Sequence, residues 1–173
     1  MAIGRFNSGI ARWVRLGNAS QPYRVRSVSD LYAQAEPEDH VKRYAILYLA
    51  TLIVIIPIDF LFLGTVAKGF FTSQVGDMLG DIRFAPAILF YLLYVAGILI
   101  FVSGPATATW QSTLLYGALF GLFCYATFEL TALSLLRHWT WPVVAVDVCW
   151  GTFVTAVSAT IGLMLTNLIA PEI

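Results

Sequence analysis

Long uncharged segments dominate the pattern of hydrophobic and polar positions in this chain. Residues 44–58, 84–128 and 148–171 carry no formal charge. A helix that crosses a bilayer needs about 20 mainly apolar residues. A turn sequence at 103–107, which contains a glycine and a proline, divides the longest of these segments in two. The pattern therefore predicts an all-α fold, a bundle of four transmembrane helices at about 44–66, 84–102, 113–136 and 142–168.

Prolines and aromatic residues agree with these boundaries. Pro86 and Pro142 fall in the first turns of the second and fourth predicted helices, where the missing N–H of proline costs no hydrogen bond. Tyr44, Trp110 and Trp141 lie near predicted helix ends, and such residues collect at the two surfaces of a membrane. Both observations favour the same four spans.

Residues 1–43 differ from the rest of the chain. Apolar residues recur at helical spacing over 1–17, Trp13 among them, while Arg5, Arg12 and Arg15 lie mostly off that face. The pattern predicts an amphipathic helix that rests on an anionic membrane surface or on a partner. An arginine-rich segment without acids is also typical of a mitochondrial targeting sequence, and a disordered tail is a third reading. The chain thus divides into a basic extension and linker, 1–43, and a membrane domain, 44–173.

Charge excludes some functions and predicts an orientation. Only 12% of residues are charged, against about 25% in a soluble domain. The 10 basic and 10 acidic residues balance, which argues against a nucleic-acid partner. Seven basic residues precede the first span, and the opposite side has the remaining three. This bias predicts an inner membrane, bacterial or mitochondrial, with both termini on the cytoplasmic or matrix side.

Three acidic residues lie inside the predicted spans: Asp59, Glu129 and Asp147. A charge in hydrocarbon costs at least about 2.5–3.5 kcal/mol, so such residues are candidates for function. Each lies about 8–11 Å from the outer end of its predicted helix, at 1.5 Å per residue. The sequence therefore predicts one polar layer, a candidate proton, cation or substrate site, formed by Asp59, Tyr91, Tyr94, Tyr125, Glu129 and Asp147.

Small residues place two of these acids on helix–helix contacts. In the third helix, every fourth residue from Gly117 to Glu129 lies on one face. In the fourth helix, Asp147 and Gly151 begin a similar stripe on one face. Small side chains let helices approach closely in lipid. We therefore expect Glu129 and Asp147 to face other helices.

The crowded acids have two interpretations. Carboxylates close together in a low dielectric cannot all stay ionised, so one is protonated or a cation is bound. They form a proton, cation or substrate site, or they hold the bundle together through hydrogen bonds to the tyrosines and to Thr127 and Thr131. Cys124 and Cys149 lie in apolar segments without a CxxC pattern, and His138 lies beside Arg137 and Trp139 in a short turn. No metal site and no cofactor is predicted, whereas bound lipid is expected.

Four blocks of sequence carry a family resemblance: Ile58–Gly64, Phe90–Gly97, Gly117–Thr131 and Asp147–Gly151. Over about 44–168 the chain resembles the predicted bacterial membrane proteins of domain-of-unknown-function family twenty-one seventy-seven. The resemblance implies four helices and no assigned activity.

The third block departs from the family pattern. Phe128, Glu129 and Ala132 stand where the family has Tyr, Asp and Asn. The departure removes a donor and an amide, which weakens a catalytic interpretation.

These observations favour an accessory or scaffold subunit of a larger membrane complex rather than an enzyme. Its expected partners are membrane lipids and other membrane-protein subunits. Two alternatives stay open: a membrane-embedded enzyme that uses the carboxylates on a lipid or isoprenoid substrate, and a proton- or cation-coupled transporter component.

Overall fold

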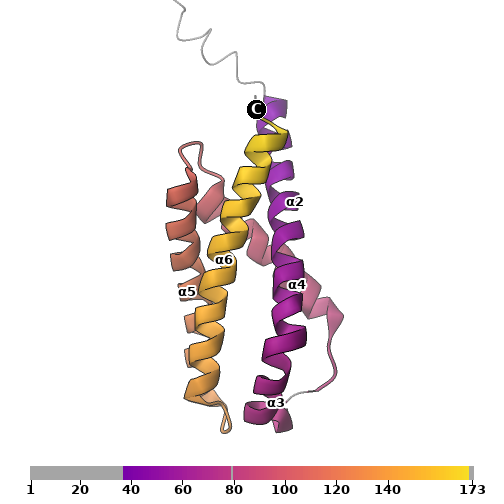
Figure 1. Cartoon of the computed structure of the whole chain (residues 1–173), viewed down its shortest axis with the longest axis vertical. Coiled ribbons are helices and arrows are strands. Elements are labelled where there is room, and N and C mark those ends of the chain that lie inside the picture. The colour runs from indigo at the N-terminus through magenta and orange to yellow at the C-terminus, as the bar shows by residue number, and fades with distance from the viewer. Residues whose placement is uncertain (1–36, 79, 172–173) are drawn as a thin grey trace, which may run out of the picture. The chain divides into compact units, whose positions relative to one another are not determined.

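The computed structural model describes residues 37–78 and 80–171, and these form helices and no strands (Figure 1). Four helices are long and apolar enough to cross a membrane. The predicted transmembrane helical fold is therefore confirmed. The expected amphipathic helix of the basic extension, with Arg5, Arg12, Trp13 and Arg15, lies outside the described residues.

The first span is longer than predicted. Helix α2 (Pro37–Phe62) continues through a π-helical segment, η1 (Leu63–Ala67), into α3 (Lys68–Val75), and a 3-10 turn, η2 (Gly76–Met78), follows. The predicted end at residue 66 was therefore too early. The 37 residues Asp39–Val75 extend over about 55 Å at 1.5 Å per residue, well beyond a hydrocarbon layer of about 30 Å. The first helix is therefore longer than one membrane crossing requires.

The other three spans follow the predicted pattern. They are α4 (Phe84–Ile98) with its π-helical continuation η3 (Leu99–Ser103), α5 (Trp110–Leu135) and α6 (Trp141–Ile169). Helix α5 begins at a capping box, in which Thr109 Oγ1 accepts a hydrogen bond of 3.2 Å from the N–H of Ser112. Such a cap satisfies a backbone donor at the helix start, and it fixes the beginning of α5 three residues earlier than predicted.

Glycines bring α5 and α6 together, as the stripes of small residues predicted. A Cβ atom on Gly121 would lie 2.5 Å from the carbonyl oxygen of Gly151, and one on Gly117 would lie 3.0 Å from Cα of Ala156. On the other side of α6, a Cβ on Gly162 would collide with Thr51 of α2. Helix α6 therefore packs closely against both α5 and α2, and it runs between them in Figure 1.

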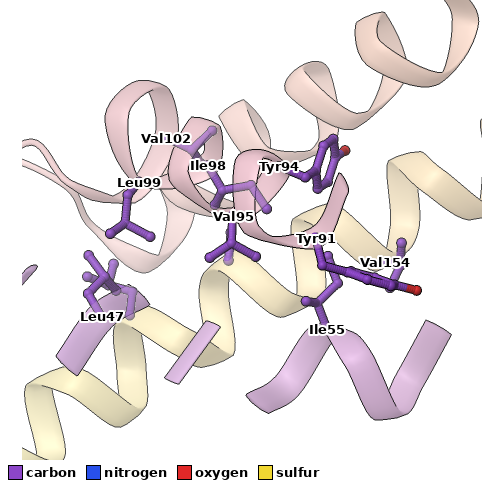
Figure 2. Close-up of a cluster of buried hydrophobic side chains, with 11 residues drawn as sticks. Leu47, Ile55, Tyr91, Tyr94, Val95, Ile98, Leu99, Val102 and Val154 are labelled. Carbon is purple, nitrogen blue, oxygen red and sulfur yellow. The ribbon is translucent and has the colours of Figure 1, made fainter. Parts of the chain in front are cut away.

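A buried cluster fills the space among α2, α4 and α6. Figure 2 shows Val95 and Ile98 on the same side of α4 as Tyr91, with Leu47 and Ile55 of α2 and Val154 of α6 in the same cluster. Leu47, Val95 and Val154 are at most 1% exposed. This cluster positions Tyr91 and Tyr94, which continue the same face of α4 toward the acids.

Two hydrogen bonds show which helix ends meet. Thr140, in the turn before α6, donates to Gln74 of α3 over 3.1 Å. Arg43, near the start of α2, donates to Asn167 near the end of α6 over 3.2 Å. In Figure 1, accordingly, α3 lies at the end where α6 begins and α2 starts where α6 ends. The predicted acids lie toward the end that carries α3.

Candidate functional site

Asp59 is held from two sides. Its Oδ1 accepts a hydrogen bond of 2.7 Å from the indole N–H of Trp150, and its Oδ2 accepts one of 2.6 Å from the hydroxyl of Tyr91. The ring of Phe62 stacks on Trp150 with the centroids 3.8 Å apart. Asp59 is only 6% exposed. Both of its oxygens therefore have a hydrogen-bond donor, one from α6 and one from α4.

Glu129 of α5 and Asp147 of α6 are a pair of acids that line the same space. Glu129 Oε2 accepts a hydrogen bond of 2.7 Å from the indole N–H of Trp139. Glu129 is 1% exposed, and Asp147 is half-buried.

Sequence position sets this pair at one depth. Glu129 lies six residues before the end of α5 at Leu135, and Asp147 lies six residues after the start of α6 at Trp141. Because the two helices are antiparallel neighbours, each acid is about 9 Å from the same end of the bundle at 1.5 Å per residue. The same distance cannot be given for the acid of the first helix, because that helix continues through α3 to Val75.

A cavity of about 350 Å³ lies between Asp59 and Asp147. Residues from α2, η1, α4, α5 and α6 line it, and apolar and aromatic side chains predominate. Five of the nine are aromatic and two are carboxylic acids. The nine lining residues are Asp59, Leu63, Phe90, Tyr94, Cys124, Tyr125, Phe128, Asp147 and Trp150. We name this space the aromatic cavity.

A second cavity of about 310 Å³ borders the same pair of acids. It reaches α3 and contains Lys68, which is exposed, as well as Glu129 and Trp139. Leu63, Phe128 and Asp147 line both spaces. We name this space the lysine cavity. Its lining is Leu63, Ala67, Lys68, Phe71, Thr72, Phe128, Glu129, Trp139 and Asp147.

The structure brings together the six residues expected in the polar layer, around the aromatic cavity and the acid pair. Tyr94 lines the aromatic cavity, while its hydroxyl lies 2.8 Å from Thr155 Oγ1 on α6. Thr127 and Thr131 do not serve the acids as expected. They are exposed, and they donate to carbonyl oxygens one turn back in α5, those of Phe123 and Thr127. This prediction was wrong because a threonine in a helix bonds its own backbone readily.

Sequence reasoning missed three side chains of the candidate site: Trp139, Trp150 and Lys68. A buried indole N–H needs an acceptor, and Trp150 follows Asp147 by three residues in a span rich in small side chains. From that spacing, Trp150 could have been predicted to lie near the acids. Lys68 was missed because the first helix was expected to end before it.

Four membrane-length helices with acids buried near one end define a multi-pass integral membrane protein. The model of a family described as predicted membrane protein (DUF2177) matches residues 44–164, and the chain belongs to this family. No match to the chain was found among curated proteins or among solved structures. The family description carries no activity, so the functional argument rests on the site itself.

Proposed function

We propose that this membrane protein binds an organic cation with apolar substituents, a hydrophobic amine or quaternary ammonium, in the aromatic cavity. The observation that carries the proposal is the meeting of five aromatic rings and two carboxyl groups on one space of about 350 Å³. Aromatic faces attract cations, by about 0.5–2 kcal/mol per contact depending on desolvation, and cages of aromatic rings recognise quaternary ammonium groups.

The charges of the site support a cationic ligand. Asp59 and Asp147 line the aromatic cavity, and Glu129 lies next to it in the lysine cavity, so three acidic groups meet around one space. Lys68 contributes one positive charge in the neighbouring lysine cavity. An excess of negative charge next to apolar walls attracts a cation more strongly than the same charges do in water. A neutral amphiphile of the same shape is not attracted by these negative charges.

This proposal selects among the functions that the sequence left open. A cation held between helices that cross a membrane suits a component of a proton- or cation-coupled transporter. The apolar walls of Leu63, Phe90 and Phe128 favour ligands with hydrocarbon or aromatic substituents over simple ions such as Na⁺.

Calorimetric titration of the purified chain in detergent tests the proposal. Benzyltrimethylammonium is a suitable probe, and neopentylbenzene, in which carbon replaces the nitrogen, is its neutral counterpart. We expect saturable binding of the cation, no binding of the neutral compound, and at least about tenfold weaker binding after Asp147→Asn, equivalent to about 1.4 kcal/mol. Asp81→Asn makes the same chemical change outside the cavity and leaves the affinity unchanged. Equal binding of both probes contradicts the proposal.

The bonds around Asp59 favour a second candidate, the accessory or scaffold subunit. Tyr91, Trp150 and Asp59 join α4, α6 and α2, which is what a purely structural polar contact does. Mild-detergent purification followed by native gel electrophoresis and mass spectrometry tests this role. Stoichiometric recovery with other membrane subunits supports it, and a small homogeneous species that binds the cation supports the first proposal.

A further inference from the structure

Part of the wall of the aromatic cavity faces the outside of the protein. Asp59 and Tyr94 line the cavity and are buried. Leu63 of η1, Phe90 of α4 and Phe128 of α5 line it as well, yet Phe90 is 42% exposed and Phe128 is 61% exposed. A side chain that both lines a cavity and is exposed marks the place where the cavity meets its surroundings. The aromatic cavity is therefore open on the side where α4 and α5 border it.

Aromatic contacts show how α4 and α5 leave this opening. Tyr94 of α4 meets Tyr125 of α5, with the ring centroids 6.1 Å apart. Closer to the acid end of the bundle, Phe90 stacks on Tyr94 of its own helix over 5.2 Å, and Phe128 meets Trp139 in the turn after α5 at 6.4 Å. Among the described residues, no ring contact joins Phe90 to Phe128. The two helices are therefore joined at Tyr94 and leave a gap beyond it.

The opening lies at a depth where lipid surrounds the protein. Phe90 follows the start of α4 at Phe84 by six residues, and Phe128 precedes the end of α5 at Leu135 by seven. Both are about 9–10 Å from the same end of the bundle at 1.5 Å per residue. Helix α5, with 26 residues, is about 39 Å long, and it extends past a hydrocarbon layer of about 30 Å by only about 5 Å at each end. The opening therefore faces hydrocarbon and not water.

We infer that the ligand of the aromatic cavity is a single-chain amphiphile with an ammonium headgroup, which enters from the bilayer between α4 and α5. The inference rests on the proposed cation site and names the class of cation that fits it. The headgroup lies among the aromatic rings beside Asp59 and Asp147. The hydrocarbon chain passes between Phe90 and Phe128 and stays in the lipid.

The chemistry of the wall matches the two parts of such a ligand. The acids and the buried Tyr94 are in the interior of the cavity, where they suit a cation. The exposed side chains at the opening are apolar, and they suit a hydrocarbon chain. A cavity of about 350 Å³ cannot enclose a headgroup together with a long chain, so a ligand of this kind needs the opening.

Photolabelling of the full chain in nanodiscs of neutral phospholipid tests the inference. The probe is a trimethylammonium compound with a twelve-carbon chain that carries a diazirine, and benzyltrimethylammonium is the competitor. We expect the probe to label Phe90 and Phe128, and saturating competitor to reduce this labelling several-fold. Phe101, 67% exposed on the same span as Phe90, reports on the ordinary lipid surface, and its labelling should not change.

A pair of variants shows whether the headgroup holds the probe in place. At a probe concentration below saturation, Asp147→Asn should lower the competitor-sensitive labelling by about tenfold. Asp81→Asn makes the same chemical change outside the cavity and should leave it unchanged. Equal labelling of the two variants overturns the inference, because the chain would then bind without its headgroup. Should Asp147→Asn not fold, the contrast between Phe101 and the two residues of the opening in the native chain decides.

The outcomes separate the two proposals. Binding of benzyltrimethylammonium with no change in the labelling of Phe90 and Phe128 overturns the lateral opening and leaves the cation site intact. Failure of the native chain to bind benzyltrimethylammonium overturns the site, and the lateral opening with it. Absence of labelling at both residues without competitor shows that protein, such as a second copy of the chain, covers the opening, and this also overturns the inference.

Discussion

The indole N–H of Trp150 on α6 donates a hydrogen bond of 2.7 Å to Oδ1 of Asp59 on α2. The same indole ring stacks on Phe62 one turn further along α2, with the centroids 3.8 Å apart. Trp150 therefore both anchors the carboxylate and forms a wall of the aromatic cavity. Packing of α2 against α6 and the geometry of the candidate site are set by one side chain.

Trp150→Phe separates these two roles. Phenylalanine retains an aromatic ring near Phe62 but lacks the donor, so Asp59 Oδ1 loses its partner while it stays buried. We expect a loss of about 1–3 kcal/mol, the usual cost of an unsatisfied buried polar group. Thermal unfolding in detergent measures it. Trp141→Phe is the matched control, because Trp141 is 67% exposed at the start of α6; an equal loss in the control would contradict the assignment.

Tyr91→Phe removes the second donor to Asp59. Because Tyr91 and Trp150 serve the same carboxylate, their effects should not add. We expect a coupling energy of about 0.5 kcal/mol or more in the double-mutant cycle with Trp150→Phe. Additive unfolding energies, measured in mixed micelles, would show that the two bonds act independently.

Gly121→Ala tests the close contact of α5 with α6. The added methyl would lie 2.5 Å from the carbonyl oxygen of Gly151, and backbone cannot move aside as a side chain can. We expect a loss of about 1–3 kcal/mol through overpacking. Gly69→Ala on α3 meets open space and should stabilise that helix by about 0.5–1 kcal/mol. Equal unfolding temperatures for the two variants would refute the packing argument.

Cys124 provides a reporter within the aromatic cavity. In a Cys149→Ala background, benzyltrimethylammonium should slow alkylation of Cys124 by N-ethylmaleimide several-fold at saturating ligand, because the ligand occupies the adjacent space. In a Cys124→Ala background, the exposed Cys149 should react at the same rate with and without the ligand. Mass spectrometry of timed samples gives both rates. An alkylation rate at Cys124 that is the same with and without the ligand would show that the ligand binds elsewhere.

The spacing of small residues in the sequence correctly predicted which faces of α5 and α6 meet. The stripe from Gly117 to Glu129 and the stripe from Asp147 through Gly151 do contact each other. A repeat of about 3.6 residues determines the face on which a side chain lies, and small residues on that face identify a close helix contact. These two rules sufficed to place the acids in the interior.

Individual hydrogen bonds were less predictable. Tyr91 was expected near the acids, and it does donate to Asp59, but neither Trp139 nor Trp150 was expected to donate to an acid. Which donor meets which carboxylate depends on how far one helix slides along another, and a single sequence does not contain that offset. Lys68 was misplaced for a different reason, because hydropathy measures how long a segment can stay in lipid and not how far its helix continues.

The π-helical segment Leu63–Ala67 determines where the first helix tolerates a change in length. Such segments correspond to one residue more than an α-helix requires, and the wider turn absorbs that residue. Deletion of a single residue within the segment would restore regular α-helical bonding and leave Lys68 on the side of Asp147. The same deletion in the regular part of α2 would rotate the residues beyond it by about 100°. Among relatives of this chain, a one-residue gap is therefore expected within this segment and not elsewhere in the first helix.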